Sequence, residues 1–297
     1  MRLNTLEIAM IKRADSDSYN IRMNPATLEL LSLIFEFKLA TAWQISRFLE
    51  QKDRSGYIYR KLHRLWRADL LESFKVFTGS RVGMPVYYIL SRNGLKILAD
   101  NGKYDAAKLR NYPRAALFAR GVFKHEAEIV ELASLESMHS SNSLRISFKG
   151  ESSSVVYDLR SSNNIEVLTP DYTVYLTVGK NQECVYSEFE RTAKSKLAME
   201  KKIERYIRYL NPEQCRHTTI RLFFQTPNME QSFWLNMISN KPGFLKRLRI
   251  FTTNLILLNS HEQFLEPIYA TENSIKLIKH GYLTASIQER VKLFSFL

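Results

Sequence analysis

Cysteine is nearly absent from this sequence. The two cysteines among 297 residues, Cys184 and Cys215, form no CxxC pair. A disulfide framework and a cysteine zinc site both need more thiols at closer spacing, so we expect neither. Such sparing use of cysteine suits a reducing compartment, which predicts a cytoplasmic protein.

Long apolar runs are also missing. The longest apolar stretch, Leu28 to Leu39, contains Glu29, Glu36 and Lys38, and the first residues hold no apolar block of the signal-peptide type. A membrane-spanning helix needs about 20 consecutive apolar residues. We therefore expect neither a membrane span nor a secretory signal, and no membrane partner.

Four common catalytic motifs are absent. The ten glycines form neither GxxxxGK[ST] nor GxGxxG, and the six histidines never form an H-x-H pair. His125-Glu126 begins like the HExxH motif, but Ile129 stands where the second histidine is required. The glycine patterns argue against an ATPase and a dinucleotide-dependent enzyme, and the missing second histidine argues against a zinc peptidase. The common tyrosine relaxases hold their metal with an H-x-H pair, which this sequence lacks.

Positive charge is abundant and clustered. The formal net charge is +13, and residues 51–120 hold 15 Lys+Arg against 5 Asp+Glu. Contacts to phosphates need basic side chains gathered on one surface, so nucleic acid is the leading partner. A basic surface that is merely solvated is the alternative.

The first hundred residues predict three helices. Asn24 before Pro25 is an N-cap with proline at the first helical position, and Thr41 with Gln44 has the form of a capping box. A third helix follows the polar break at 52–55. Its apolar stripe has helical spacing and consists of Ile58, Leu62 and Leu65.

Two strands follow these helices. They are predicted over Leu71–Phe77 and Val86–Leu90, joined by a turn-rich loop that contains Arg81. Three helices and a two-stranded wing predict a winged helix-turn-helix domain over 1–104, whose third helix enters the major groove of DNA. The predicted DNA contacts are Tyr57, Arg60, Lys61, Arg64 and Arg81. A winged helix used for protein pairing is the alternative.

Beyond residue 104, strands alternate with helices. We expect a basic linker helix over 105–120, an α/β domain over 121–260 and a helical tail over 261–297 that covers the core or mediates self-association as a homodimer. The main strands are predicted over Leu144–Phe148, Val155–Leu159, Asp171–Val178, Glu183–Glu190, Thr219–Thr226 and Arg249–Leu258. Helices are predicted over 118–138, 192–210 and 229–238.

Carboxylates are spaced along two of these strands. Asp171 follows Pro170 and opens one strand, while Glu188 and Glu190 share a face of the next because side chains alternate along a strand. Such a set can bind Mg²⁺ or Mn²⁺ through oxygen, and the cation can activate water near a phosphate. A solvated strand face is the alternative interpretation.

The following helix adds a cation beside these acids. Lys202 and Tyr206 stand four residues apart and therefore share a helix face. A lysine above the acidic strand can stabilise charge on a phosphate. Tyr206 and Tyr209 are candidate nucleophiles, although aromatic residues on such a helix commonly pack in the core.

The second part of the chain resembles the PD-(D/E)XK restriction-endonuclease-like fold. The resemblance rests on a helix that carries Glu126, followed by Pro170-Asp171, Glu188-x-Glu190 and Lys202-x-x-x-Tyr206. With the preceding winged helix, the chain more narrowly resembles the replication-relaxation group and the MobC-type plasmid relaxases. The resemblance implies an α+β winged helix-turn-helix domain followed by an α/β PD-(D/E)XK domain that cuts a DNA strand with Mg²⁺ or Mn²⁺.

The resemblance also implies roles for single residues. Asp171 and Glu188 would bind the metal, with Glu126 as a helper carboxylate and third ligand. Glu190 stands where the family pattern places lysine, so Lys202 is expected to supply the ammonium, with Lys194 and Lys196 as substitutes. Without a lysine at the site, the domain would be a DNA-binding relative that lacks activity.

We therefore expect a DNA endonuclease of relaxase type that nicks a plasmid or mobile-element origin of transfer or replication. Its partners would be double-stranded DNA, single-stranded DNA at the nick, and mobilisation or transfer proteins. Two alternatives remain: a DNA-binding replication or mobilisation accessory protein without catalysis, and a transposon-type endonuclease that cleaves transposon ends.

Overall fold

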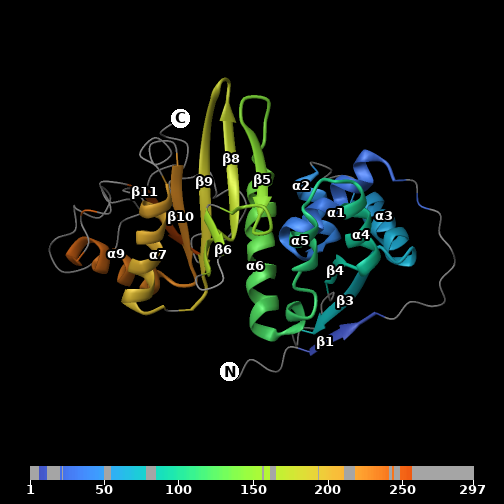
Figure 1. Ribbon diagram of the computed structural model, residues 1–297, viewed down its shortest axis with the longest axis horizontal. Coiled ribbons are helices and arrows are strands. Elements are labelled where there is room, and N and C mark those ends of the chain that lie inside the picture. Colours follow the sequence, from blue (N-terminus) through green and yellow to red (C-terminus); the bar gives the residue numbers. More distant parts are fainter. Residues whose placement is uncertain are drawn as a thin grey trace. The chain divides into compact units, whose positions relative to one another are not determined.

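The chain forms two compact units, residues 1–138 and 139–297. The computed structural model describes residues 7–11, 21, 23–49, 55–77, 85–155, 157–160, 165–192, 194–210, 218–240, 243 and 248–255. Each unit contains helices and a sheet, so the protein is mixed α and β (Figure 1). None of the helices in these ranges is long and apolar enough to cross a membrane.

Unit 1 begins with the helices that the capping residues predict. Helix α1 spans Pro25–Phe37, and the Asn24 side chain accepts the Thr27 N–H at its start. Helix α2 spans Ala42–Phe48, with a complete capping box between Thr41 and Gln44. Helix α3 spans Ser55–Arg67, and its predicted apolar stripe is buried: Ile58, Leu62 and Leu65.

A four-stranded sheet completes the core of unit 1. Strands β3, Leu71–Phe77, and β4, Val86–Leu90, have the predicted bounds and pair antiparallel. Two strands that the sequence pattern did not reveal flank them in the order β1-β3-β4-β2. Strand β1 is Glu7–Met10 and strand β2 is Ala40–Thr41.

The predicted linker helix over 105–120 is wrong. Helix α4, Arg92–Asp100, is followed by the short helix α5, Ala106–Arg110, and a 3-10 turn at Ala116–Phe118. Pro113 lies between the two segments and lacks the N–H that a continuous helix needs. The segment packs into unit 1 because Tyr112 is buried and its hydroxyl donates to the Lys38 carbonyl oxygen.

The last helix of unit 1 is α6, Arg120–Ser137. The sequence pattern assigned these residues to the second domain, whereas the division between the compact units falls after Met138. Buried side chains along α6 include Phe123, Ile129, Val130 and Ala133.

Unit 2 is organised around a five-stranded sheet in the order β11-β10-β9-β8-β5. Strands β5, β8 and β9 are antiparallel neighbours, and β9, β10 and β11 are parallel. The strands are β5 Arg145–Gly150, β8 Tyr172–Val178, β9 Asn181–Glu190, β10 Thr218–Phe224 and β11 Arg249–Asn254. Strands β6, Tyr157–Arg160, and β7, Ile165–Leu168, form a separate hairpin.

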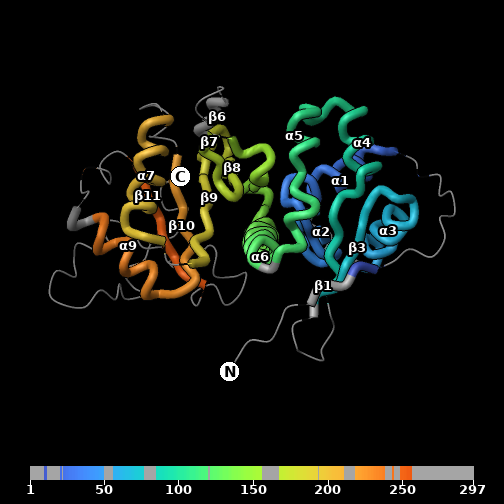
Figure 2. The backbone as a smooth tube through the Cα atoms, turned by 60° about the horizontal axis from the view of Figure 1, so that its bottom comes forward, coloured from blue at the N-terminus to red at the C-terminus, as the bar shows by residue number. Residues whose placement is uncertain are grey.

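Two helices cover one face of this sheet. Helix α7, Lys196–Tyr209, connects β9 to β10, and helix α9, Pro227–Asn240, lies between β10 and β11 (Figures 1 and 2). Both contribute to one buried apolar core with Ile220, Leu222 and Ile250 of the sheet. Parallel strands joined by covering helices place their carboxyl ends at the same edge, which is where α/β proteins commonly bind ligands.

Candidate functional site

Strand β9 places two carboxylates next to helix α7. It is the central strand of the sheet, and Glu188 and Glu190 lie near its carboxyl end. Alternation along the strand puts both on the face that α7 covers. Both are almost fully buried, at 3% and 1% exposure, so their charges require partners inside the protein.

Helix α7 supplies those partners. Lys202 Nζ lies 2.6 Å from Glu188 Oε2 and 2.6 Å from Glu190 Oε1. One turn later, the Tyr206 hydroxyl donates to Glu188 Oε1 at 2.6 Å. The predicted shared face of Lys202 and Tyr206 is therefore real, because both side chains reach the same carboxylate.

Asp171 lies at the start of the neighbouring strand β8. Its Oδ2 accepts the backbone N–H of Phe189 at 2.6 Å. Its charge also contributes to raising the pKa of Glu188. We refer to Asp171, Glu188, Glu190, Lys202 and Tyr206 together as the acidic cluster.

Burial and charge oppose each other in the acidic cluster. Burial raises the pKa of Glu188, and the Lys202 ammonium acts against that rise. Burial acts to lower the pKa of Lys202, but Glu188, Glu190 and Asp171 outweigh it and hold that pKa above its ordinary value. Lys202 therefore stays protonated at neutral pH, as a fixed cation between two carboxylates.

A second lysine approaches Glu190. Lys194 Nζ lies 2.7 Å from Glu190 Oε2, and its side chain is 40% exposed. Of the two substitute lysines, Lys194 thus contacts an acid of the cluster. Lys196 lies in the first turn of α7 and lines a pocket beside Glu190.

Glu126 belongs to unit 1. It is buried on α6, and its Oε1 lies 2.6 Å from Lys38 Nζ. Asp171 and Glu188 belong to unit 2. The predicted convergence of Glu126 with these two residues stays a prediction, and Glu126 has a lysine partner within its own unit.

The predicted DNA-binding face on α3 is largely exposed. Tyr57 is 49% exposed, and Arg60 and Arg64 are exposed as well. Lys61 is half-buried: burial lowers its pKa, and the Glu29 carboxylate acts against that change. Tyr59, 51% exposed, is a further aromatic residue on this helix. Arg81 lies outside the described residues.

Comparison with known proteins identifies the family. The model of the replication-relaxation family matches residues 31–222, which is well over half of the chain. The chain belongs to the replication-relaxation family. No curated protein and no solved structure matches it.

Membership in this family supports a role in replication or mobilisation. The matched region includes α3 in unit 1, and in unit 2 all five residues of the acidic cluster. The two features that the sequence pattern singled out therefore lie within the family-defining part of this replication-relaxation protein.

Glu188 and Glu190 of this replication-relaxation protein have the donor atoms of a metal site. Oxygens of Glu188 and Glu190 converge on one point, the Lys202 nitrogen, and carboxylate oxygens suit Mg²⁺ and Mn²⁺. Within the described ranges, no three His, Cys, Asp or Glu side chains are grouped so as to hold a metal. The donor type fits a divalent cation, which would have two glutamate ligands and take the place of the ammonium.

Sequence reasoning missed a buried arginine on the opposite face of the sheet. Arg221 is fully buried on β10, and its Nη2 donates to Ser187 Oγ at 2.7 Å and to the Tyr172 hydroxyl at 3.1 Å. Its guanidinium also lies 4.7 Å from the centre of the Phe223 ring. An arginine within an apolar strand carries no signal of these partners, because Ser187 and Tyr172 come from other strands.

Proposed function

We propose that this replication-relaxation protein is a DNA endonuclease of relaxase type, which nicks one strand at a replication or transfer origin. The observation that carries the proposal is the Lys202 ammonium, 2.6 Å from each of two buried glutamates at the carboxyl end of a central strand. Phosphodiester cleavage needs carboxylate ligands for a divalent cation and a positive charge near the phosphate. Two glutamates in contact with one lysine match both needs.

Each member of the acidic cluster has a role in this proposal. Glu188 and Glu190 would hold Mg²⁺ or Mn²⁺, which polarises the phosphoryl group and lowers the pKa of a bound water. Lys202, kept protonated by these acids, would move from the carboxylates to the phosphate and stabilise negative charge there. Tyr206 holds Glu188 in place through its hydroxyl, and Asp171 tethers β8 to the Phe189 backbone.

Unit 1 would locate the DNA. Its helices α1, α2 and α3 and its antiparallel strands support a winged helix-turn-helix, in which α3 enters the major groove. The exposed Tyr57, Arg60 and Arg64 supply aromatic and basic groups on that helix. In this proposal unit 1 selects the site and unit 2 resembles the PD-(D/E)XK nucleases.

The cleavage step can be tested with supercoiled plasmid. Incubation with DNA from the protein's own genetic element and Mg²⁺ or Mn²⁺ should yield open circles. Glu188→Gln and Glu190→Gln keep side-chain size and should lower the nicking rate at least about 100-fold, because ligand charge is lost at the cation that stabilises the transition state.

Glu183 provides a matched control. It is also a buried glutamate on β9, but its Oε1 accepts from Thr219, away from the acidic cluster. Glu183→Gln should nick like the wild type, provided that thermal melting shows all variants folded. Equal nicking by wild type, Glu188→Gln and Glu190→Gln would refute the proposed site.

The alternative is a DNA-binding accessory factor without catalysis. One observation favours it: Lys202 and Tyr206 donate to three of the four oxygens of Glu188 and Glu190, and the fourth lies 2.7 Å from the Lys194 ammonium. The charges of the two glutamates are therefore paired without metal. This function predicts salt-dependent DNA binding with no cleavage at any divalent cation concentration, and unchanged binding by Glu188→Gln.

A further inference from the structure

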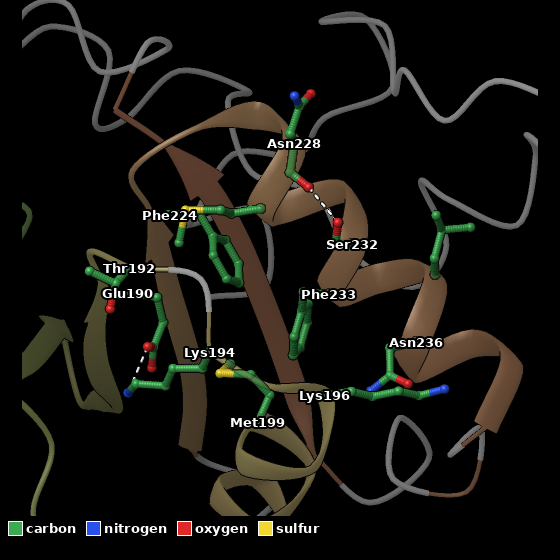
Figure 3. A pocket seen from close by; sticks show the side chains of 12 residues that line it. Glu190, Thr192, Lys194, Lys196, Met199, Phe224, Asn228, Ser232, Phe233 and Asn236 are labelled. Atoms are coloured by element: carbon green, nitrogen blue, oxygen red, sulfur yellow. Dashed lines mark hydrogen bonds and ion pairs between the residues drawn. The ribbon is translucent and has the colours of Figure 1, made fainter.

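A pocket of about 760 Å³ opens beside the acidic cluster. Glu190 and Phe224, which end the parallel strands β9 and β10 and lie side by side in register, form its base. The first turn of α7 and the first three turns of α9 form its walls (Figure 3). Its volume lies within the range of pockets that hold small organic ligands.

One part of the pocket is aromatic and apolar. Phe224 and Phe233 are packed with ring centres 5.5 Å apart, and Met199 lies next to them. Figure 3 shows both rings among the side chains that line the cavity. Leu235, 49% exposed, extends this apolar surface. Phe224 and Phe233 are only 3% and 5% exposed, so only their edges reach the cavity and Leu235 supplies most of the apolar contact. An apolar wall of this kind can hold a nucleobase with little preference among bases.

The polar part of the pocket is cationic. Lys194 and Lys196 both line it, and in Figure 3 they lie on opposite sides. The first turns of α7 and α9 also border it, and the N–H groups at helix starts carry partial positive charge. An anionic group is therefore favoured beside the apolar surface.

Glu190 adds a hydrogen-bond acceptor. It is the one acid among the described residues that line the pocket, and it is 1% exposed. Its Oε2 accepts no hydrogen bond from the described residues, although Lys194 Nζ lies 2.7 Å away. Because this oxygen is buried, a ligand N–H or O–H would satisfy it by taking the place of the Lys194 ammonium, whose side chain is 40% exposed.

An apolar surface, two lysines and one acceptor together match a nucleotide. We propose that the pocket binds one nucleotide of single-stranded DNA, with its base against Leu235 and the edges of Phe224 and Phe233, its phosphate near Lys196, and a base N–H donating to Glu190. The inference rests on the proposed function, since it places this nucleotide beside the strand to be cut.

Two matched pairs of variants test the pocket. Ser232 is exposed and lines it, so Ser232→Glu introduces a negative charge at the mouth, whereas Gln231→Glu makes the same change one position away, outside the lining. Lys196→Gln removes a lining lysine, and Lys201→Gln removes an exposed lysine of α7 that lies outside it. The hydroxyl of Ser232 donates only within α9, to the Asn228 carbonyl oxygen, among the contacts described.

The readout is fluorescence anisotropy with a labelled 12-nucleotide single strand and with the corresponding duplex, at one salt concentration. We expect Ser232→Glu to weaken single-strand binding about tenfold or more and Lys196→Gln about threefold to tenfold. Gln231→Glu and Lys201→Gln should change it less than twofold, and duplex binding should be unaffected in all four.

Three outcomes would overturn the inference. In the first, Ser232→Glu and Gln231→Glu bind the single strand equally well. In the second, Ser232→Glu loses as much affinity for the duplex as for the single strand. The third is competition by a free deoxynucleoside monophosphate as effective as that by the oligonucleotide, which would assign the pocket to a free nucleotide. Plasmid nicking separates this inference from the proposed function: wild type that binds single strands through the pocket but never nicks would refute only cleavage.

Discussion

At the scale of single residues, the buried acids are tolerated because each faces a donor. Removing one member of a buried ion pair commonly costs 3–5 kcal/mol, since an unpaired charge remains in a poorly solvated place. Lys202 bridges two glutamates, so its loss would leave both without their shared cation. The same residue that serves the proposed chemistry therefore also stabilises the fold of unit 2.

Cys184, on β9, gives a prediction of pH dependence. Burial raises the pKa of its thiol from 9.0 to about 11. Because the thiolate is the reactive form, its fraction at pH 8 should be about 100-fold smaller than for an ordinary thiol. In a Cys215→Ser background, reaction with a disulfide reagent should be slow at pH 8 and accelerate about tenfold per pH unit toward pH 11.

The unfolded chain is the control for this thiol. In concentrated urea, Cys184 should react at pH 8 at the rate of an exposed cysteine. A folded protein that reacts as fast as the unfolded one at pH 8 would contradict the raised pKa.

At the scale of elements, close packing of α4 against the turn between α3 and β3 depends on a glycine. A Cβ atom at Gly94 would lie 2.2 Å from the Leu70 carbonyl oxygen, which accepts the Ser91 N–H at the start of α4. Backbone atoms cannot turn away as a side chain can. Gly94→Ala should therefore lower the free energy of unfolding by about 1–3 kcal/mol in urea titrations.

Gly121 of α6 provides the comparison. A Cβ there meets nothing within 4 Å, so Gly121→Ala should leave stability unchanged or raise it by up to about 1 kcal/mol. Equal effects of the two substitutions would show that the contact with Leu70 is unimportant.

Elements also show where local signals suffice. Caps at Asn24 and Thr41 mark the starts of α1 and α2 as predicted, because each side chain accepts the N–H of the residue three positions ahead. Strand β1 escaped prediction, since its pairing with β3 joins residues about 70 positions apart and leaves no local pattern.

At the scale of the whole molecule, the net charge of +13 and its concentration in residues 51–120 predict salt-dependent DNA binding. The double variant Arg60→Gln/Arg64→Gln should bind duplex DNA more weakly. It should also reduce the slope of log affinity against log salt by about one for each lost phosphate contact. Titrations between 50 and 200 mM salt would measure both, a range over which such binding changes strongly.

A charge-matched variant checks that the effect belongs to α3. Arg92 and Lys96 are exposed on α4, so Arg92→Gln/Lys96→Gln removes the same two charges from another helix. If both double variants lose the same affinity and slope, the basic surface acts as a whole and α3 does not read the DNA.

The sequence by itself determined the features that depend on near neighbours. Helix starts, the bounds of β3 and β4, the buried stripe of α3 and the shared face of Lys202 and Tyr206 all follow from spacings of a few residues. Glu188 and Glu190 could be chosen as a pair because alternation along one strand is local.

Only the tertiary structure decided which groups meet. Lys202 reaches both glutamates because α7 folds back over β9, and Glu126 pairs with Lys38, 88 positions earlier in the chain. The pocket beside Glu190 likewise joins side chains of β9, β10, α7 and α9. Such contacts depend on how elements pack. The charge and periodicity of one element do not show which other element will lie beside it.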